Sequence, residues 1–146
     1  MFGVIVADTN FSELSVTVFD ELNKKARELG EVALFYVNLS SQVTEADFSI
    51  MNITEIANAY GWSLVATCLM SADILKKTAV NAEKAYYMMD LSFLMRPYDF
   101  NSVYDTLSGL KLITRSEYHQ KIIKNIFNLD SVVLQFSVDS LCNTPS

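Results

Sequence analysis

The chain has 146 residues, of which 51% are hydrophobic and 19% are charged, and its formal net charge is −6. This composition excludes a disordered chain, and the length fits one domain with a core of its own. The 11 basic residues are spread along the sequence, so no basic stripe faces a phosphate backbone and we expect no nucleic-acid partner.

Membrane, secretion and metal signals are weak in this sequence. No apolar run approaches the ~20 residues of a membrane-spanning helix, so we expect no membrane span. The first residues reach Asp8 without a positive segment, which does not fit a signal peptide. We interpret Cys68 and Cys142 as free thiols in a reducing compartment, which predicts a cytoplasmic location. With a single histidine, we expect no histidine-based metal site and no cofactor.

The first part of the chain predicts a strand, a helix and a second strand. Residues 2–7 are apolar and end at Asp8-Thr9-Asn10. A helix over 12–29 follows, with Asn10 as its cap, Glu13 in the capping-box position and Gly30 at its end. Residues 32–37 are apolar without alternation, which is typical of a strand covered on both faces.

The next part predicts a long connection, two short helices and a third strand. Residues 38–51 form a polar connection with a short apolar end, and loops of this length are uncommon unless they are functional. A helix begins after Asn52, where Glu55 repeats the capping pattern, and ends at Gly61. Residues 64–67 predict a strand, and a short helix over 71–77 follows it.

The remaining part predicts three further strands separated by helical segments. We expect strands over 85–89, 110–114 and 132–136, a helical turn over 91–95, and helices over 101–108 and 117–128. The chain therefore predicts an α/β three-layer sandwich with a mostly parallel Rossmann-like sheet. We expect one domain over 1–140, a flexible tail over 141–146, and helices 12–29 and 117–128 as the longest.

The carboxyl ends of the strands are the expected ligand site. Parallel sheets bind ligands there, at the point where the strand order reverses. We expect the ends of strands 2–7 and 63–68 to flank that point, and a set of small, polar or charged residues to line one cleft. The set is Asp8, Thr9, Asn10, Thr67, Cys68, Asp90, Arg115 and Ser116.

Each candidate has a functional and a structural interpretation. Asp8 and Asp90 end strands, where a carboxylate can act as a catalytic base. Asp8 can instead order the turn before the next helix, and Asp90 can instead cap the turn 91–95. Arg115 and Ser116 at a helix start suit an anion, although they also fit a capped helix without a ligand.

Known catalytic motifs are absent from the sequence. There is no G-x-G-x-x-G and no phosphate-binding G-x-x-x-x-G-K-[ST], and the chain holds only four glycines. A Ser-His-Asp triad could use only His119, which lies in an amphipathic helix one turn after Ser116. His119 is a minor ligand-binding candidate, with a structural histidine as the alternative. A receiver domain is excluded, because Cys68 and Arg115 stand where it needs an acid and a lysine.

Three segments share their order and spacing with one known family. They are Val65-Ala-Thr-Cys-Leu-Met-Ser-Ala72, Ala85-Tyr-Tyr-Met-Met-Asp-Leu-Ser-Phe-Leu94 and Leu112-Ile-Thr-Arg-Ser-Glu-Tyr-His-Gln-Lys-Ile-Ile123. Together they resemble the strand with an ATS-like turn, the YYVQDxExxF segment and the LxITNSExxKxxL segment in the amino-terminal domain of GT-B glycosyltransferases. The resemblance covers residues 63–128, and short viral proteins of marine origin are similar in the same way.

The resemblance implies a standalone acceptor-side half of a GT-B enzyme. Such a half binds a sugar-containing or nucleotide ligand, and by position its site maps onto Asp8–Asn10, Thr67-Cys68, Asp90 and Arg115-Ser116. Two departures matter: the family's glycine-rich first turn is Asp8-Thr9-Asn10-Phe11-Ser12 here, and its donor-binding second domain is missing. Catalysis would then need a homodimer or a separate donor-domain partner.

A second interpretation is a non-catalytic binding or assembly module that retains the fold. The missing glycine turn, the absent second domain and the lone histidine favour it. What separates the two interpretations is whether the charged candidates serve a ligand or are used in caps and salt bridges.

Overall fold

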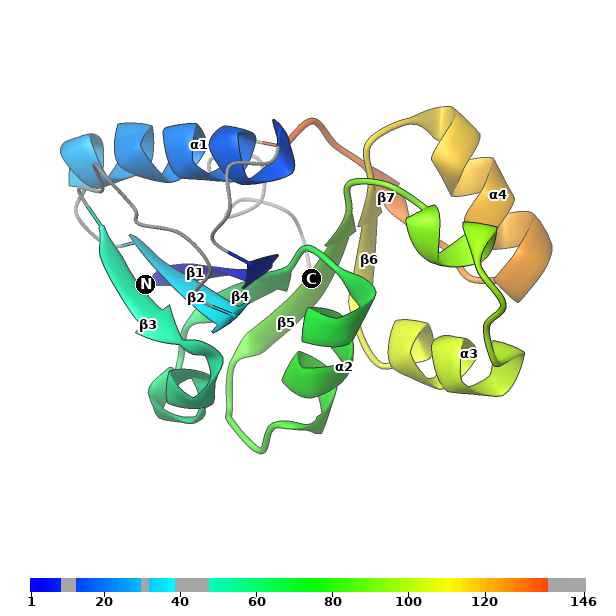
Figure 1. Cartoon of the computed structure of the whole chain (residues 1–146), viewed down its shortest axis with the longest axis horizontal. Helices are drawn as coiled ribbons and strands as arrows, with labels where there is room; N and C mark the ends of the chain where they lie inside the picture. Colours follow the sequence, from blue (N-terminus) through cyan, green and yellow to red (C-terminus); the bar gives the residue numbers. More distant parts are fainter. Residues whose placement is uncertain (9–12, 30–31, 39–47, 137–146) are drawn as a thin grey trace.

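The computed structural model describes residues 1–8, 13–29, 32–38 and 48–136 (Figure 1). Its strands are β1 (Phe2–Asp8), β2 (Val32–Asn38), β3 (Ser49–Asn52), β4 (Ser63–Ala66), β5 (Glu83–Met88), β6 (Lys111–Thr114) and β7 (Val132–Val133). Its helices are α1 (Glu13–Leu29), α2 (Leu69–Lys77), α3 (Phe100–Ser108) and α4 (Glu117–Phe127), with the 3-10 helices η1 (Ile53–Asn58) and η2 (Ser92–Met95).

The strands form one sheet in the order β3-β2-β1-β4-β5-β6-β7, and every pair is parallel. This confirms the predicted α/β fold with a Rossmann-like sheet. Strand β1 lies between β2 and β4, and Val4 pairs with Leu34 on one side and Val65 on the other. The strand order therefore reverses between β1 and β4, as we predicted from the strand ends.

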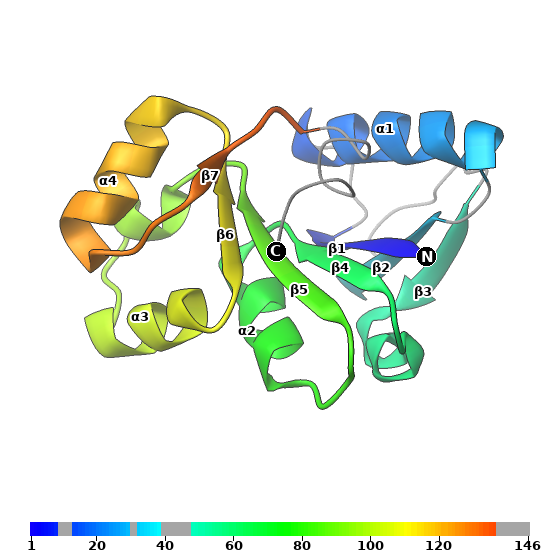
Figure 2. The ribbon, with the colours of Figure 1, turned by 180° about the vertical axis from the view of Figure 1, so that it is seen from behind.

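The helices cover the two faces of the sheet unequally. Helix α1 packs on one face through Val18 and Leu22, whereas η1, α2, α3 and α4 contribute to the core on the other face. Figures 1 and 2 show α1 apart from α2 and α3, with the twisted sheet between them. The result is the predicted three-layer sandwich.

The chain after β7 completes the layer that α1 begins. The Tyr87 hydroxyl donates to the carbonyl of Leu134 at 2.7 Å, and the Phe136 ring contacts the Tyr87 ring edge-on at a centroid distance of 5.3 Å. Figure 2 shows this segment running from β7 toward the amino-terminal end of α1. Residues 134–136 therefore cover the part of the sheet face that α1 does not reach.

Two element predictions were wrong. Residues Ser49–Asn52 form β3 at the sheet edge, although we predicted 38–51 as a connection. The strand is only four residues long and depends on pairing with β2, so its own pattern is too short to indicate it. Conversely, β7 has two residues instead of five. The Leu134 N–H still donates to the carbonyl of Thr114 in β6 at 3.0 Å, and the chain then leaves the sheet.

Most helix predictions are confirmed. Helices α1 and α4, with 17 and 11 residues, are the longest in the described part of the chain. Asn52 caps η1 and Ser116 caps α4 through their side chains. The predicted cap Asn10, the stop at Gly30 and the tail 141–146 lie outside the described residues.

Candidate functional site

A pocket of about 350 Å³ lies at the carboxyl ends of β4 and β5. Its lining residues are Thr67, Cys68, Leu69, Tyr86, Asp90, Ser92, Phe93, Arg96, Pro97 and Tyr98. The structure thus brings together Thr67, Cys68 and Asp90, three of the predicted site residues. They come from the ends of neighbouring strands, beside the point where the strand order reverses.

Thr67 fixes the end of β4 against β1. Its hydroxyl donates to the carbonyl of Ile5 at 2.7 Å, and its backbone N–H donates to the same oxygen at 3.2 Å. The side chain is buried, so these bonds replace the water that the hydroxyl would otherwise contact. Thr67 therefore holds the wall of the pocket in place. Its hydroxyl proton is already bonded to Ile5, so it is not available to a ligand.

Cys68 begins α2 at the pocket wall. Its Sγ accepts from the backbone N–H of Ser71 at 3.4 Å, and the Ser71 hydroxyl accepts from the backbone N–H of Cys68 at 3.2 Å. This reciprocal pattern is a capping box with a thiol in place of the usual hydroxyl. Cys68 is a free cysteine, as expected, whereas Cys142 lies outside the described residues.

Asp90 follows β5 and lies at the exposed rim of the pocket. Its Oδ1 accepts from the backbone N–H of Ser92 at 3.0 Å. This is the capping role that we gave as the structural interpretation of Asp90. Its Oδ2 has no hydrogen-bond or ion-pair partner in the described part of the chain and remains available to a ligand.

Tyr86 reaches the pocket from the inside of the fold. The side chain is 2% exposed, yet its hydroxyl has no hydrogen-bond partner among the described residues. Burial, followed by the nearby Cys68 and Asp90, raises the pKa of this hydroxyl. Tyr86 therefore stays protonated and can donate a hydrogen bond into the pocket.

The predicted site set did not contain Tyr86, Tyr98 or Arg96, although the sequence gives the two tyrosines as rings that could stack on a sugar or base. A tyrosine in an apolar strand usually belongs to the core, and only alternation along β5 suggests that Tyr86 and Tyr87 face opposite sides. Arg96 looked like the residue that ends a turn before Pro97. It is exposed at the pocket rim, without an ion-pair partner among the described residues.

Arg115 does not line this pocket. Its Nη1 donates to the carbonyl of Met89 at 3.1 Å. Burial raises the pKa of Tyr87, and the charge of Arg115 acts in the opposite direction. Because Tyr87 and Met89 pack in the core cluster on the α1 face, Arg115 is associated with that side of the sheet.

Ser116 and His119 also do not line the pocket. The Ser116 hydroxyl accepts from the backbone N–H of His119 at 3.2 Å, which is an ordinary helix cap. The His119 Nδ1 is buried without a partner in the described region, and its ring lies 6.1 Å from that of Tyr118.

The first strand ends at the same edge of the sheet. Asp8 is the last residue of β1 and pairs with Asn38 of β2. Because all strands are parallel, Asp8 and Asp90 stand at the same edge rather than at opposite ends. The side chain of Asp8, together with Thr9 and Asn10, lies outside the described residues.

A larger pocket of about 560 Å³ lies between α2 and α3, but its polar groups bind one another. Lys77 pairs with Asp73 at 3.0 Å, the Thr106 hydroxyl donates to the other Asp73 oxygen at 3.2 Å, and Lys76 donates to the carbonyl of Asp105. The strand-end pocket is the better candidate site, because its Tyr86 hydroxyl and Arg96 side chain have no such partners.

Within the described ranges, no group of three or more His, Cys, Asp or Glu residues could hold a metal ion. No helix in the same ranges is long and apolar enough to cross a membrane. Comparison of the chain with family models, with curated proteins and with solved structures gave no match.

Proposed function

We propose that this chain binds a small sugar-containing or nucleotide ligand in the strand-end pocket, as a glycosyltransferase-like, acceptor-side half of the GT-B type. The observation that carries the proposal is the position of the pocket. It lies at the carboxyl ends of β4 and β5, next to the reversal of strand order in an all-parallel sheet. Ligands bind α/β sheets at this place because the loops and helix starts diverge there.

The side chains that line the pocket suit a sugar. Asp90 Oδ2 can accept hydrogen bonds from ligand hydroxyls, and Tyr86 can donate one. Tyr98 is 39% exposed, so part of its ring is free to pack against the apolar face of a sugar or base. Several polar groups that converge on a partly aromatic pocket are typical of small-molecule sites.

A second candidate function is a non-catalytic binding or assembly module. One oxygen of Asp90 caps a turn, and Arg115 binds a backbone carbonyl. Asp90 and Arg115 therefore both have structural roles. This favours a chain that binds a ligand without catalysing a reaction. In the first candidate function, the catalytic groups would be completed by a second copy or by a donor-domain partner.

Thermal unfolding with a ligand panel tests the proposal. The panel contains sugar nucleotides, sugar phosphates and neutral sugars, each added to the full chain. A ligand at 100 times its Kd stabilises the folded state by about 2.7 kcal/mol, which raises the Tm by several degrees. We expect at least one member to do so, and the absence of any rise would contradict the proposal.

Two serine variants show whether the strand-end pocket is the binding site. Ser92 is exposed and lines this pocket, so Ser92→Trp should fill it and abolish the rise in Tm. Ser102 is exposed and lines the α2–α3 pocket instead, so Ser102→Trp should keep the rise. If Ser102→Trp abolishes the rise in Tm and Ser92→Trp keeps it, the ligand binds in the α2–α3 pocket instead. Binding without sugar transfer, with or without a donor-domain partner, would favour the second candidate function.

A further inference from the structure

Two neighbouring tyrosines of β5 differ in one respect that points to a ligand. Tyr87 donates to the carbonyl of Leu134 at 2.7 Å, on the α1 face of the sheet. Tyr86 packs on the opposite face, where its hydroxyl has no partner in the described part of the chain. The hydroxyl is not among the fully buried atoms without a partner in the described ranges, so it reaches the space of the pocket that Tyr86 lines and is free to bond to a ligand there.

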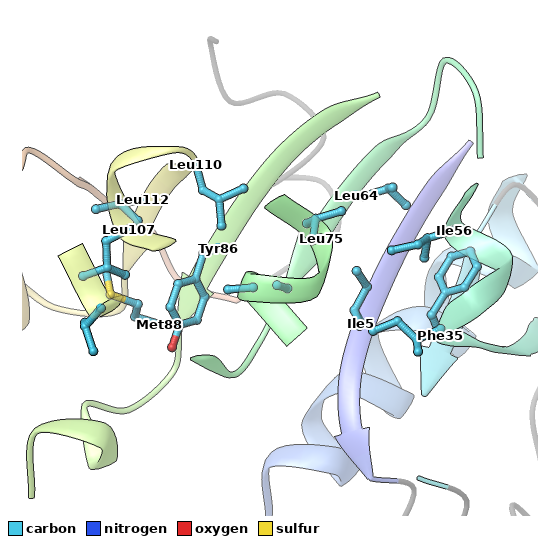
Figure 3. Packing of buried hydrophobic residues seen from close by; sticks show 14 of the residues in the cluster. Ile5, Phe35, Ile56, Leu64, Leu75, Tyr86, Met88, Leu107, Leu110 and Leu112 are labelled. Carbon is cyan, nitrogen blue, oxygen red and sulfur yellow. The ribbon is translucent and has the colours of Figure 1, made fainter. Parts of the chain in front are cut away.

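The pocket is the place from which a partner for this hydroxyl can come. Tyr86 is 2% exposed, and it lines the pocket. In Figure 3 the hydroxyl oxygen points away from Leu110, which precedes β6, and hence toward the carboxyl edge of the sheet. A ligand in the strand-end pocket can therefore accept a hydrogen bond from Tyr86.

The pocket also holds two opposite charges that do not pair with each other. Asp90 and Arg96 both line it, yet no ion pair joins them, and Arg96 has no other acidic partner in the described ranges. A carboxylate accepts hydrogen bonds from sugar hydroxyls, whereas a guanidinium binds an anion such as phosphate. One ligand that carries both hydroxyls and an anionic group would satisfy both side chains.

The size of the pocket limits which ligands can fit. Its volume of about 350 Å³ is close to the lower end of the ~300–1,000 Å³ range of small-molecule sites. A single sugar with one phosphate suits this space better than a larger nucleotide conjugate does.

We propose that the strand-end pocket takes a phosphorylated monosaccharide. Tyr86 donates a hydrogen bond to a ligand oxygen at the floor, Arg96 binds the phosphate at the rim, and Asp90 Oδ2 accepts from the sugar hydroxyls. This inference rests on the proposed function and specifies its ligand. It assigns Tyr86 and Arg96 as recognition residues and involves no chemical step.

Isothermal titration calorimetry of the full chain tests this inference. The probes are the 1- and 6-phosphates of glucose, galactose and mannose, the three parent hexoses, inorganic phosphate and a set of sugar nucleotides. We expect at least one hexose phosphate to bind about tenfold or more tightly than its parent hexose and than inorganic phosphate, because hydrogen bonds to a charged group are the stronger ones.

Variants assign the contacts. Tyr86→Phe keeps the ring and should weaken binding of the hexose phosphate about tenfold, whereas Tyr87→Phe should leave it unchanged. Arg96→Gln should remove the preference for the phosphorylated sugar. Lys121→Gln removes an exposed cation of α4 that does not line the pocket and should keep that preference.

Several outcomes would overturn the inference. It is wrong if the parent hexose binds as tightly as its phosphate, if inorganic phosphate binds as tightly as both, or if Tyr86→Phe binds like the wild type. Binding of sugar nucleotides only would also overturn it while leaving the proposed function intact. If no neutral, phosphorylated or nucleotide-linked sugar binds, the proposed function fails together with this inference.

Discussion

At the scale of single residues, Thr67, Cys68 and Asp90 all bond to the backbone at the pocket, and Asp90 also keeps one oxygen without a partner among the described residues. Asp90 uses Oδ1 to hold the Ser92 N–H at 3.0 Å and keeps Oδ2 at the rim. Cys68 uses its thiol as a helix cap. Its structural role therefore leaves Asp90 able to accept a further hydrogen bond, because a carboxylate has more acceptor sites than one cap requires.

Substitution of Asp90 measures its structural role. We expect Asp90→Ala to lower the free energy of unfolding by about 1 kcal/mol, because the Ser92 N–H loses its acceptor. Asp90→Asn keeps an oxygen at Oδ1 and should cost only a few tenths of that. Urea unfolding of both variants checks this, and an Ala variant as stable as the wild type would show that the cap contributes nothing.

At the scale of elements, the wall of the pocket depends on how closely β4 lies to β1. Thr67 joins the two strands through the carbonyl of Ile5, and Gly3 of β1 lies between the side chains of Phe35 and Leu64. A Cβ at Gly3 would stand 2.7 Å from Phe35 Cε2 and 2.9 Å from Leu64 Cδ2. Both neighbours are fully buried and have little room to move.

Gly3→Ala should therefore be destabilising. We expect a loss of about 1–3 kcal/mol in the free energy of unfolding, which is the usual cost of overpacking a core. In a Phe35→Leu background the aromatic edge is gone, so the same change should cost clearly less. Chemical denaturation of the two single variants and the double variant gives both numbers, and equal costs in the two backgrounds would contradict the crowding argument.

At the scale of the whole molecule, the sheet divides the tyrosines of β5 between two cores. Tyr86 belongs to the core under α2 and α3, and Tyr87 to the core under α1. Burial raises the pKa of both hydroxyls, and Arg115 partly opposes this at Tyr87. In the folded chain these two hydroxyls therefore keep their protons at a pH near 10, where the same tyrosines in the unfolded chain lose them.

This difference makes the stability fall at high pH. The contribution of the protonated tyrosines is fully present below about pH 10 and is lost as the pH rises above it, at up to about 1.4 kcal/mol per pH unit for Tyr86. Tyr86→Phe should flatten the fall between pH 10 and 11.5, and Tyr87→Phe should flatten it less. Urea unfolding across this range provides the slopes, and equal slopes in Tyr86→Phe and wild type would refute the assignment.

Local properties of the sequence were sufficient to predict most elements and part of the site. Capping at Asn52, Ser116 and Asp90 depends on side chains within three residues of the N–H group they bind, so it can be read from neighbouring positions. The apolar runs indicated the parallel sheet and its carboxyl edge, where Thr67, Cys68 and Asp90 line one pocket.

Other features depended on contacts between distant segments. Strand β3 exists because β2 offers an edge to pair with, and no local pattern encodes that edge. Arg115 binds the carbonyl of Met89 and does not line the pocket. The residues next to Arg115 in the sequence do not indicate which of these two positions its side chain takes. Likewise, Tyr86 and Tyr87 are the same residue type at neighbouring positions, and only the packing of opposite faces decides that one hydroxyl is bonded and the other is directed into the pocket.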